Sequence, residues 1–213
     1  MTKGRELEAS YCKEVYSKDS YFELTQLQSQ IFQILGIRKF KPKKILEIGI
    51  GSGFTSLFLK RAGYDVTTVD INENLQPDVC CDIANVNKNI NPDGFDLSVC
   101  CQVLEHIPFD EFEGCIKNLS LYGNLYLTLP NYYSYFGFSG ILRLPHVRKI
   151  FSLYFRSPFK IKKLQDGIHF WEVDSHSETS RKKIVLILLK YFSRVEVKII
   201  PTNPYHLQFF CHK

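Results

Sequence analysis

The sequence lacks any apolar run of the roughly 20 residues that a helix needs to cross a bilayer, so we expect no transmembrane segment. Residues 1–6 also lack the apolar stretch that characterises a signal peptide, which makes the cytoplasm the expected location. Charge of either sign is not in large excess, because 27 basic and 22 acidic side chains give a net charge of +5. Such a balance does not by itself indicate a nucleic-acid partner, and we expect none.

Metal-binding cysteine motifs are absent as well. The seven cysteines are an odd number, which favours free thiols in a reducing compartment. Cys80 with Cys81 and Cys100 with Cys101 are adjacent pairs, whereas zinc sites usually separate their cysteines by two to four positions. Both pairs lie in apolar stretches, so we predict buried thiols in strands and no metal site.

The composition is that of an ordinary globular protein. Of the 213 residues, 45% are apolar and 23% are charged, which fits a single domain over residues 1–213. Residues 1–40 are predicted to be an N-terminal helical segment. Apolar residues at helical spacing place its helix at 21–35, and Gly36 is expected to end that helix.

From residue 44 onward, short apolar strands alternate with amphipathic helices. The predicted strands are 44–48, 65–69, 79–81, 95–101, 124–129, 194–200 and 205–211, and the predicted helices are 54–62, 109–119 and 178–191. This alternation predicts a parallel sheet with helices on both faces. The last two strands are joined by a short turn and should therefore pair antiparallel. We expect an α/β, Rossmann-like fold with a seven-stranded, mostly parallel sheet that ends in an antiparallel hairpin.

The most informative segment is a glycine loop between a predicted strand and a predicted helix. Gly49, Gly51 and Gly53 stand at alternate positions, and Glu47 precedes them. Glycine permits close approach of a ligand to the backbone, and a helix start offers free N–H groups and positive potential. A dinucleotide fingerprint, G-x-G-x-x-G, would need glycine at position 54, where the chain has Phe54. The loop therefore predicts a ligand site and disfavours a nicotinamide dinucleotide.

Two acidic residues follow the next predicted strands. Asp70 lies at about the sequence distance at which an acid reaches the ribose in a βαβ nucleoside site, and its carboxylate can accept hydrogen bonds from both hydroxyls. Asp82 follows the third strand and is a candidate acceptor for an adenine amino group. The alternative interpretation of each acid is structural, as a helix cap or a solvated loop residue.

These motifs, in this order, resemble the class I S-adenosylmethionine-dependent methyltransferases. The matching blocks are Glu47-Ile48-Gly49-Ile50-Gly51-Ser52-Gly53, Val69-Asp70, Cys81-Asp82-Ile83, Phe95-Asp96-Leu97 with Leu104-Glu105-His106-Ile107-Pro108, and Leu127-Thr128-Leu129-Pro130-Asn131. The block that contains Glu105 is similar to that of small-molecule members, including quinone-biosynthesis O-methyltransferases. The resemblance covers residues 44–131 and implies the class I methyltransferase fold, S-adenosylmethionine as cofactor and S-adenosylhomocysteine as product.

The resemblance also implies roles for individual residues. The glycines would contact the methionine part of the cofactor, the acid before them would help to hold its amino group, and the two later acids would bind ribose and adenine. In chain order these residues are Glu47, Gly49, Gly51, Gly53, Asp70 and Asp82. The further cofactor-binding candidates are Ile71, Ile83, Gln102 through its backbone carbonyl, and Leu104 in the adjacent wall. Glu105 is open to two interpretations, an exposed acid in a turn or a site residue.

Methyl transfer to an oxygen requires the acceptor to be aligned opposite the sulfonium and, for a hydroxyl, a base. His106 and His169 are the candidate catalytic residues because imidazole titrates near neutral pH. A structural role in its turn is the alternative for His106. Tyr132, Tyr133, His169 and Trp171 are expected to contact the acceptor. The H-x-W-E run that contains Trp171 is loosely similar to methyltransferases of glycan and lipid pathways.

An insertion follows the fifth predicted strand. Residues 132–165 contain seven basic and nine aromatic side chains and no Asp or Glu. We predict a basic, aromatic, helical insertion at 132–168. Four interpretations stay open: a lid over the acceptor site, a contact with an anionic membrane through 143–163, a stacking surface for single-stranded nucleic acid, and a plain cap.

Together these features predict an S-adenosylmethionine-dependent methyltransferase with a small-molecule acceptor. A hydroxyl oxygen of a quinone-like, sugar or lipid-linked substrate is the expected acceptor. The alternatives are a cofactor-binding module without catalysis and a nicotinamide-dependent oxidoreductase, and a protein acceptor also stays open.

Overall fold

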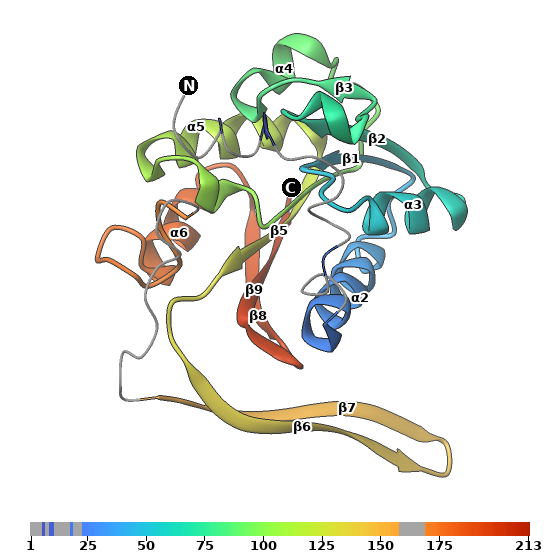
Figure 1. Ribbon diagram of the computed structural model, residues 1–213, viewed down its shortest axis with the longest axis vertical. Helices are drawn as coiled ribbons and strands as arrows, with labels where there is room; N and C mark the ends of the chain where they lie inside the picture. The colour runs from blue at the N-terminus through green and yellow to red at the C-terminus, as the bar shows by residue number, and fades with distance from the viewer. Residues whose placement is uncertain (1–5, 7–8, 11–17, 19–22, 158–168) are drawn as a thin grey trace.

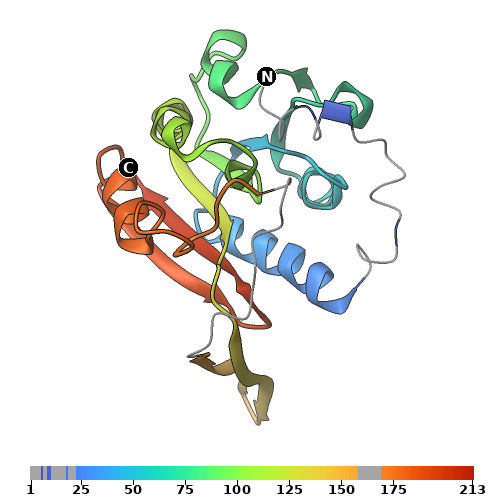
Figure 2. The ribbon, with the colours of Figure 1, turned by 60° about the vertical axis from the view of Figure 1, so that its left-hand side comes forward.

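The computed structural model of the chain describes residues 6, 9–10, 18, 23–157 and 169–213. These residues form one main sheet with helices on both faces, and a long two-stranded hairpin extends away from it (Figures 1 and 2).

The main sheet has seven strands, and its order places the ligand edge. In space the strands follow one another as β3 (Val79–Cys80), β2 (Asp65–Asp70), β1 (Lys44–Ile48), β4 (Leu97–Cys101), β5 (Asn124–Pro130), β9 (Asn203–His212) and β8 (Arg194–Ile200). The strands from β3 to β5 are parallel, whereas β9 is antiparallel to both of its neighbours, so the predicted sheet is confirmed. The strand order reverses between β1 and β4, where open α/β sheets bind ligands. Cys100 is buried as predicted, but Cys80 is exposed because β3 is an edge strand.

Helices cover both faces of this sheet. α2 (Leu24–Arg38) and α3 (Phe54–Arg61) pack on one face, and α5 (Phe109–Leu119) and α6 (Arg181–Leu188) pack on the other (Figure 2). The short α4 (Val86–Asn89) follows β3 in the chain. Side chains of a strand point alternately to the two sides, so Leu125 and Leu127 join the α5 side and Tyr126 joins the α2 side. Among the residues described, no helix is long and apolar enough to cross a membrane.

The helix α2 differs from the predicted one at both ends. It continues to Arg38, so Gly36 lies inside the helix and does not end it. A Cβ at Gly36 would lie 2.5 Å from Cε2 of Tyr126, so glycine lets the helix lie close against the sheet. Residues 21–22, where the helix was expected to begin, lie outside the described residues.

The prediction of a helical insertion after the fifth strand is wrong. β6 (Tyr135–Leu144) and β7 (Val147–Arg156) form an antiparallel hairpin that extends away from the domain (Figure 1). Apolar and aromatic side chains alternate along its strands with a period of two, as Phe136 and Phe138 do, and this period suits a strand better than a helix. The remainder of the insertion, 158–168, lies outside the described residues.

Candidate active site

The carboxyl ends of β1, β2 and β4 meet at a cavity of about 550 Å³. Its wall combines the glycine loop, the ends of three strands, helix α2, the segment before α6 and the start of β9. The lining residues include Glu47, Gly49, Gly51, Asp70, Ile71, Asp82, Ile83, Gln102, Val103, Glu105, His106, His169 and Tyr205. A cavity of this size at this edge of an α/β sheet is large enough for a small-molecule ligand.

The glycine loop is shaped by backbone angles that other residues rarely adopt. Gly49, Gly51 and Gly53 have φ angles of 77°, 49° and 75°. A Cβ at Gly49 would lie 2.3 Å from Cγ2 of Val103, so any side chain at this position would press into the cavity wall. The loop therefore presents bare backbone to the space beyond β1.

Asp70 ties the end of β2 to this loop. Its Oδ2 accepts a hydrogen bond from the N–H of Ile50 at 2.9 Å, and its Oδ1 accepts one from the N–H of Asn72 at 2.9 Å. Burial raises the pKa of Asp70, and the backbone N–H groups around it partly offset this effect. The carboxylate is thus fixed at the wall of the cavity, next to the glycine loop.

Glu47 lies at the end of β1 and is 5% exposed. Burial raises the pKa of its carboxyl to about 8, and the Ser56 hydroxyl and the charge of Lys60 oppose that rise. A positively charged ligand group beside Glu47 would lower this pKa again and favour the carboxylate. The residue therefore suits an ammonium ligand.

Asp82 combines the two interpretations that its sequence left open. Its Oδ1 accepts a hydrogen bond from the N–H of Ala84 at 2.8 Å, which caps the short turn Ile83–Asn85, and the residue also lines the cavity. Gln102 lines the cavity with a left-handed φ of 57°, and its side-chain amide donates to Oγ1 of Thr128 at 3.2 Å. Ile71 and Ile83 belong to the same wall.

Two predicted cofactor contacts lie outside the wall. Leu104 is fully buried in the core, and its neighbour Val103 lines the cavity in its place. The short turn Leu104–His106 causes this exchange because it directs its first side chain inward. Gly53 is the N-cap of α3, so it shapes the loop and does not line the cavity.

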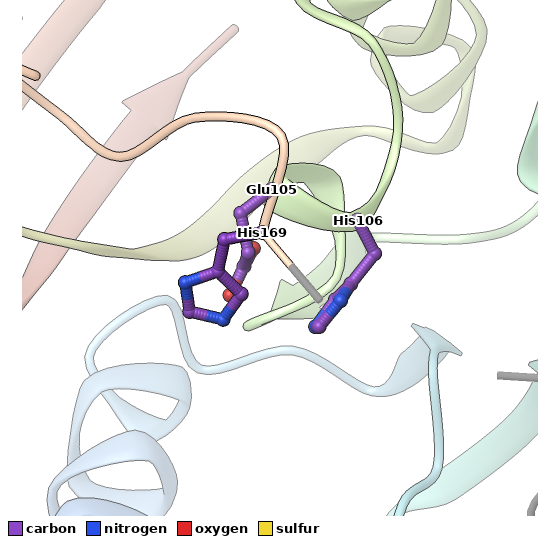
Figure 3. A group of neighbouring side chains, drawn as sticks. All are labelled: Glu105, His106 and His169. Atoms are coloured by element: carbon purple, nitrogen blue, oxygen red, sulfur yellow. The ribbon is translucent and has the colours of Figure 1, made fainter. Parts of the chain in front are cut away.

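The two candidate catalytic histidines meet at the same cavity. The rings of His106 and His169 lie edge to face, with their centroids 5.1 Å apart. Glu105, which is fully buried, points into the space beside them (Figure 3). A backbone hydrogen bond from Phe170 to the carbonyl of Glu105, at 2.8 Å, joins the two chain segments that carry these residues.

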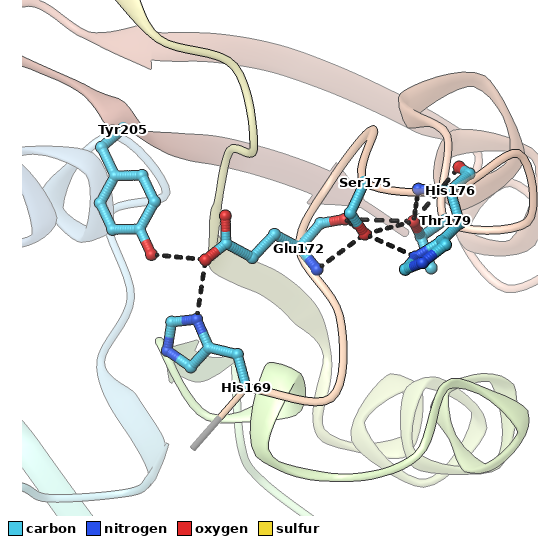
Figure 4. A network of polar contacts seen from close by, with 6 residues as sticks. All are labelled: His169, Glu172, Ser175, His176, Thr179 and Tyr205. Carbon is cyan, nitrogen blue, oxygen red and sulfur yellow. Dashed lines mark hydrogen bonds and ion pairs between the residues drawn. The ribbon is translucent and has the colours of Figure 1, made fainter. Parts of the chain in front are cut away.

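His169 is oriented by a buried carboxylate. Its Nδ1 lies 3.0 Å from Oε1 of Glu172, and the Tyr205 hydroxyl donates to the same oxygen at 2.9 Å (Figure 4). A carboxylate only accepts hydrogen bonds, so in a neutral imidazole this contact favours the tautomer with the proton on Nδ1 and the lone pair on Nε2. Ser175 and Thr179 bond to the backbone of Glu172 and hold it in place.

Three predicted acceptor contacts lie elsewhere. Trp171 is 2% exposed, packs against Phe109 and Phe112, and donates from Nε1 to the carbonyl of Ile107 at 3.0 Å. It is a core residue. Tyr132 and Tyr133 lie at the base of the hairpin and do not line the cavity. None of the hairpin residues that the structure describes lines it either, so the hairpin is not a lid in this structure.

Comparison with known protein families identifies part of the chain. The family of tellurite resistance protein TehB matches residues 10–112. A probable S-adenosyl-L-methionine-dependent methyltransferase TehB from Haemophilus influenzae (strain 10810) is 36% identical over 64 residues, which are 30% of this chain and 22% of that relative. The chain therefore matches less than a quarter of this curated relative's length.

Solved structures match nearly the whole chain. An S-adenosylmethionine-dependent methyltransferase from Archaeoglobus fulgidus has a TM-score of 0.62 at 15% identity, covering 94% of this chain and 99% of that chain. Magnesium protoporphyrin IX methyltransferase from Synechocystis PCC 6803, solved with bound S-adenosylmethionine, has a TM-score of 0.58 at 14% identity, covering 100% and 98%. The chain therefore has the fold of class I S-adenosylmethionine-dependent methyltransferases. The predicted class I methyltransferase fold is thereby confirmed.

Sequence reasoning missed several residues of this cavity. Tyr205 comes from a distant part of the chain, and only folding brings it to Glu172, which itself lies three positions after His169. The polar face of α2 also lines the cavity, with Gln26, Ser29, Gln30 and Gln33. The polar residues of α2 at helical spacing were the one available signal.

Proposed function

We propose that this protein binds S-adenosylmethionine and transfers its methyl group to a hydroxyl oxygen of a small-molecule acceptor. One observation carries the proposal: a single cavity joins the glycine loop and Asp70 to the histidine pair, His106 and His169. A cofactor site and a group able to act on an acceptor proton thus share one enclosed space. Such proximity is the main requirement of a transfer reaction.

The residues fit the cofactor in two respects. The glycine loop offers bare backbone at Gly49, and the buried Glu47 suits the ammonium of the cofactor's amino acid part. Asp70 would hold the ribose hydroxyls and Asp82 the adenine amino group, with Ile71, Ile83 and the carbonyl of Gln102 completing the site. The sequence alternative of a nicotinamide cofactor is disfavoured because Phe54 replaces the third glycine of its fingerprint.

When bound, S-adenosylmethionine supplies an electrophilic methyl group whose bond to sulfur breaks as the acceptor oxygen bonds to it. The chain's residues would then orient the acceptor, exclude water and accept the hydroxyl proton. His169 suits this last task because Glu172 orients it with the Nε2 lone pair directed away from that carboxylate. His106, across from it, would share the contact with the acceptor.

The acceptor class is part of the proposal. Tyr205 lies beside the His169–Glu172 pair, and Gln26 and Gln30 also line the cavity; such polar groups favour a hydroxyl-bearing ring over an aliphatic chain. We include quinone-like, sugar and lipid-linked acceptors. The related magnesium protoporphyrin IX methyltransferase is named for a ring-bearing small molecule, which supports an acceptor of this size.

Cofactor binding is the first test. S-adenosylhomocysteine should co-purify with the protein or bind to it in calorimetry, and Asp70→Ala should weaken that binding by roughly tenfold or more because the ribose hydroxyls lose their acceptor. Asp93→Asn is a matched control because Asp93 is exposed in a distant loop. Equal affinity of the Asp70 variant and the wild type would contradict the ribose assignment.

Methyl transfer is the second test. Release of S-adenosylhomocysteine from S-adenosylmethionine should rise with one of a panel of catechols, quinols and sugars, and His169→Asn should lower the rate with little change in cofactor affinity. Binding of the cofactor without turnover on any acceptor would favour a non-catalytic cofactor-binding module.

A further inference from the structure

The histidine pair forms a compact group with a carboxylate. One potential ligand atom from each of Glu105, His106 and His169 lies within 4.8 Å of the others (Figure 3). All three residues line the cavity, and Glu105 is fully buried. Burying a carboxylate is unfavourable in itself, and cation coordination is one way in which proteins compensate it.

The group is held in place by its surroundings. Glu105 and His106 lie in one short turn after β4, whereas His169 belongs to the segment before α6. Two hydrogen bonds fasten that segment to the turn: Phe170 donates to the carbonyl of Glu105 at 2.8 Å, and Trp171 donates to the carbonyl of Ile107 at 3.0 Å. Rigid support of this kind is what a preformed ligand set requires.

The contacts behind His169 follow a pattern typical of metal sites. Metal-binding histidines usually donate their second ring N–H to a carboxylate, which fixes the tautomer and strengthens the ligand nitrogen. Glu172 provides this carboxylate 3.0 Å from Nδ1, and Tyr205 donates to Glu172 in turn (Figure 4). His169 is therefore prepared to bind a cation through Nε2.

We propose that Glu105, His106 and His169 bind a divalent first-row transition metal ion at the acceptor end of the cavity. Two imidazoles and one carboxylate suit Mn²⁺, Fe²⁺, Co²⁺ or Zn²⁺ better than Ca²⁺, which takes only oxygen ligands. Three protein ligands leave coordination positions open for an acceptor oxygen. The site lies in a part of the chain where the sequence indicated no metal, because only the fold brings His169 to the other two residues.

The chemical role of the ion rests on the proposed methyl transfer. An acceptor hydroxyl bound to the cation loses its proton to water more readily, since the ion stabilises the alkoxide. The oxygen then forms its bond to the methyl carbon while the S–CH₃ bond breaks and its electron pair stays on sulfur. The metal changes no oxidation state. With the ion bound, His169 acts as a ligand and no longer as the base. The ion instead makes the acceptor hydroxyl more acidic.

Metal binding by the full chain tests the site without any acceptor. Protein freed of metal by a chelator is titrated with Mn²⁺, and free Mn²⁺ is followed by electron paramagnetic resonance. We expect one ion per chain, with Glu105→Gln and His169→Asn each weakening its affinity by roughly tenfold or more, as Glu172→Gln should too. Co²⁺ should give visible absorption bands that the same substitutions remove.

His146→Asn is the matched control. His146 is exposed in the hairpin turn at a φ of 66°, which asparagine also tolerates, so its Mn²⁺ affinity should equal that of the wild type. Absence of a stoichiometric site for both ions, or an affinity unchanged by Glu105→Gln and His169→Asn, would overturn the proposal. Should S-adenosylhomocysteine still bind in that case, the proposed function stands without the metal. Should it fail to bind as well, both proposals fall.

A second, independent feature is the exposed face of the hairpin. Cross-strand register places Phe136 opposite Phe155 and Phe138 opposite Leu153. We call the side of the hairpin that carries these pairs the apolar hairpin face. Its large apolar side chains are 39–59% exposed. They are Phe136, Phe138, Leu142, Leu144, Val147, Phe151, Leu153 and Phe155. An exposed apolar surface of this extent marks an interaction site.

The other face of the hairpin is fastened to the domain. Tyr154 donates to the carbonyl of Pro201, and Asn131 donates to the Tyr135 hydroxyl at 3.0 Å. Tyr135 and Tyr154 project from the opposite side of the two strands to the apolar hairpin face, because strand side chains alternate. At the base of the hairpin the apolar hairpin face is therefore turned away from the domain, whereas toward the tip Ile141 and Ile150 on the opposite face are also 49–55% exposed.

The charge around this face selects its partner. Lys149 is exposed on this face, Arg143 and Arg156 are exposed on the opposite face, and residues 135–156 contain no acidic side chain. A second copy of the hairpin would meet the first with like charge, whereas an anionic lipid surface offers both apolar and negative groups. We infer that the apolar hairpin face binds to the surface of an anionic bilayer.

Cosedimentation with vesicles tests this contact. The full chain should bind vesicles of phosphatidylcholine mixed with phosphatidylglycerol and bind pure phosphatidylcholine weakly. The double variant Phe136→Ser, Phe155→Ser should lose roughly tenfold or more in affinity, since two apolar side chains that would be buried in the bilayer are removed. Leu186→Ser, at an exposed apolar position on α6, should bind like the wild type. Failure of the wild type to bind either vesicle, or a dimer in ultracentrifugation that the double variant abolishes, would refute the lipid assignment.

Discussion

Replacing Glu47 with glutamine measures how ionisation of this buried carboxyl changes the stability of the protein. Burial raises the pKa of Glu47 in the folded protein from 4.5 to about 8. Between these two values the folded protein keeps a proton that the unfolded chain has released, so the free energy of unfolding falls as the pH rises through this window. At roughly 1.4 kcal/mol for each pKa unit, the loss reaches about 5 kcal/mol by the upper end of the window.

Glutamine stays neutral, so the variant lacks this loss. We expect Glu47→Gln and the wild type to be similarly stable near the lower end of the window, and the variant to be more stable by about 3 kcal/mol at neutral pH. Urea unfolding of both proteins, followed by circular dichroism across the window, measures the difference. Subtracting the two curves removes the contributions of the other titrating groups. A difference that does not change with pH would refute the pKa assigned to Glu47.

The same variant separates stability from ligand binding. An ammonium group placed beside Glu47 favours its carboxylate, so binding of S-adenosylhomocysteine should release a proton at neutral pH and tighten as the pH approaches the pKa of about 8. Glu47→Gln should therefore bind the ligand more weakly although it is the more stable protein. Calorimetry in buffers of different ionisation enthalpy counts the protons released. Equal ligand affinity of the two proteins at alkaline pH would show that this carboxylate does not contact the ligand.

Glycine substitutions test the packing at two other points. Gly49→Ala should lower stability by about 1–3 kcal/mol in urea unfolding, because it combines a strained φ with a Cβ only 2.3 Å from Cγ2 of Val103. Val103→Ala in the same chain should recover only the part due to that contact; full recovery would contradict the strained backbone. Gly36→Ala should lower the melting temperature because of its close neighbour, whereas Gly114→Ala, in an exposed helical position with open space, should raise stability by about 0.5–1 kcal/mol. Equal shifts for the two helical glycines would argue against the packing assigned to Gly36.

The sheet was predictable because its strands carry strong local signals. The strands at Lys44–Ile48 and Arg194–Ile200 and the helix at Phe109–Leu119 have the predicted bounds, since each is an apolar or amphipathic run set off by polar or turn residues. The glycine loop and Asp70 also meet, since the N–H of Ile50 donates to Asp70. Their contact depends only on consecutive elements of one βαβ unit, so sequence order alone brings them together.

Features that depend on contacts between distant residues could not be predicted from the sequence. The hairpin was predicted as a helix because its basic and aromatic composition outweighed its period of two, and composition says little about backbone conformation. Leu104 was expected in the cavity wall but is buried in the core, and Val103 lines the cavity in its place. Glu105 could not be assigned from its local sequence, since its surroundings include His169 from another segment of the chain.

The run from His169 to Glu172 shows why a short motif can be functional although most of its residues never touch a ligand. Phe170 and Trp171 fasten the segment to the turn after β4 through a backbone bond to Glu105 and an indole bond to Ile107. Glu172, one residue further along, orients the imidazole of His169 from behind. Only His169 reaches the cavity, and its position depends on all three neighbours. A substitution at Trp171 should therefore disturb the acceptor end of the site as a packing defect does, through the position of His169 and without loss of any direct ligand contact.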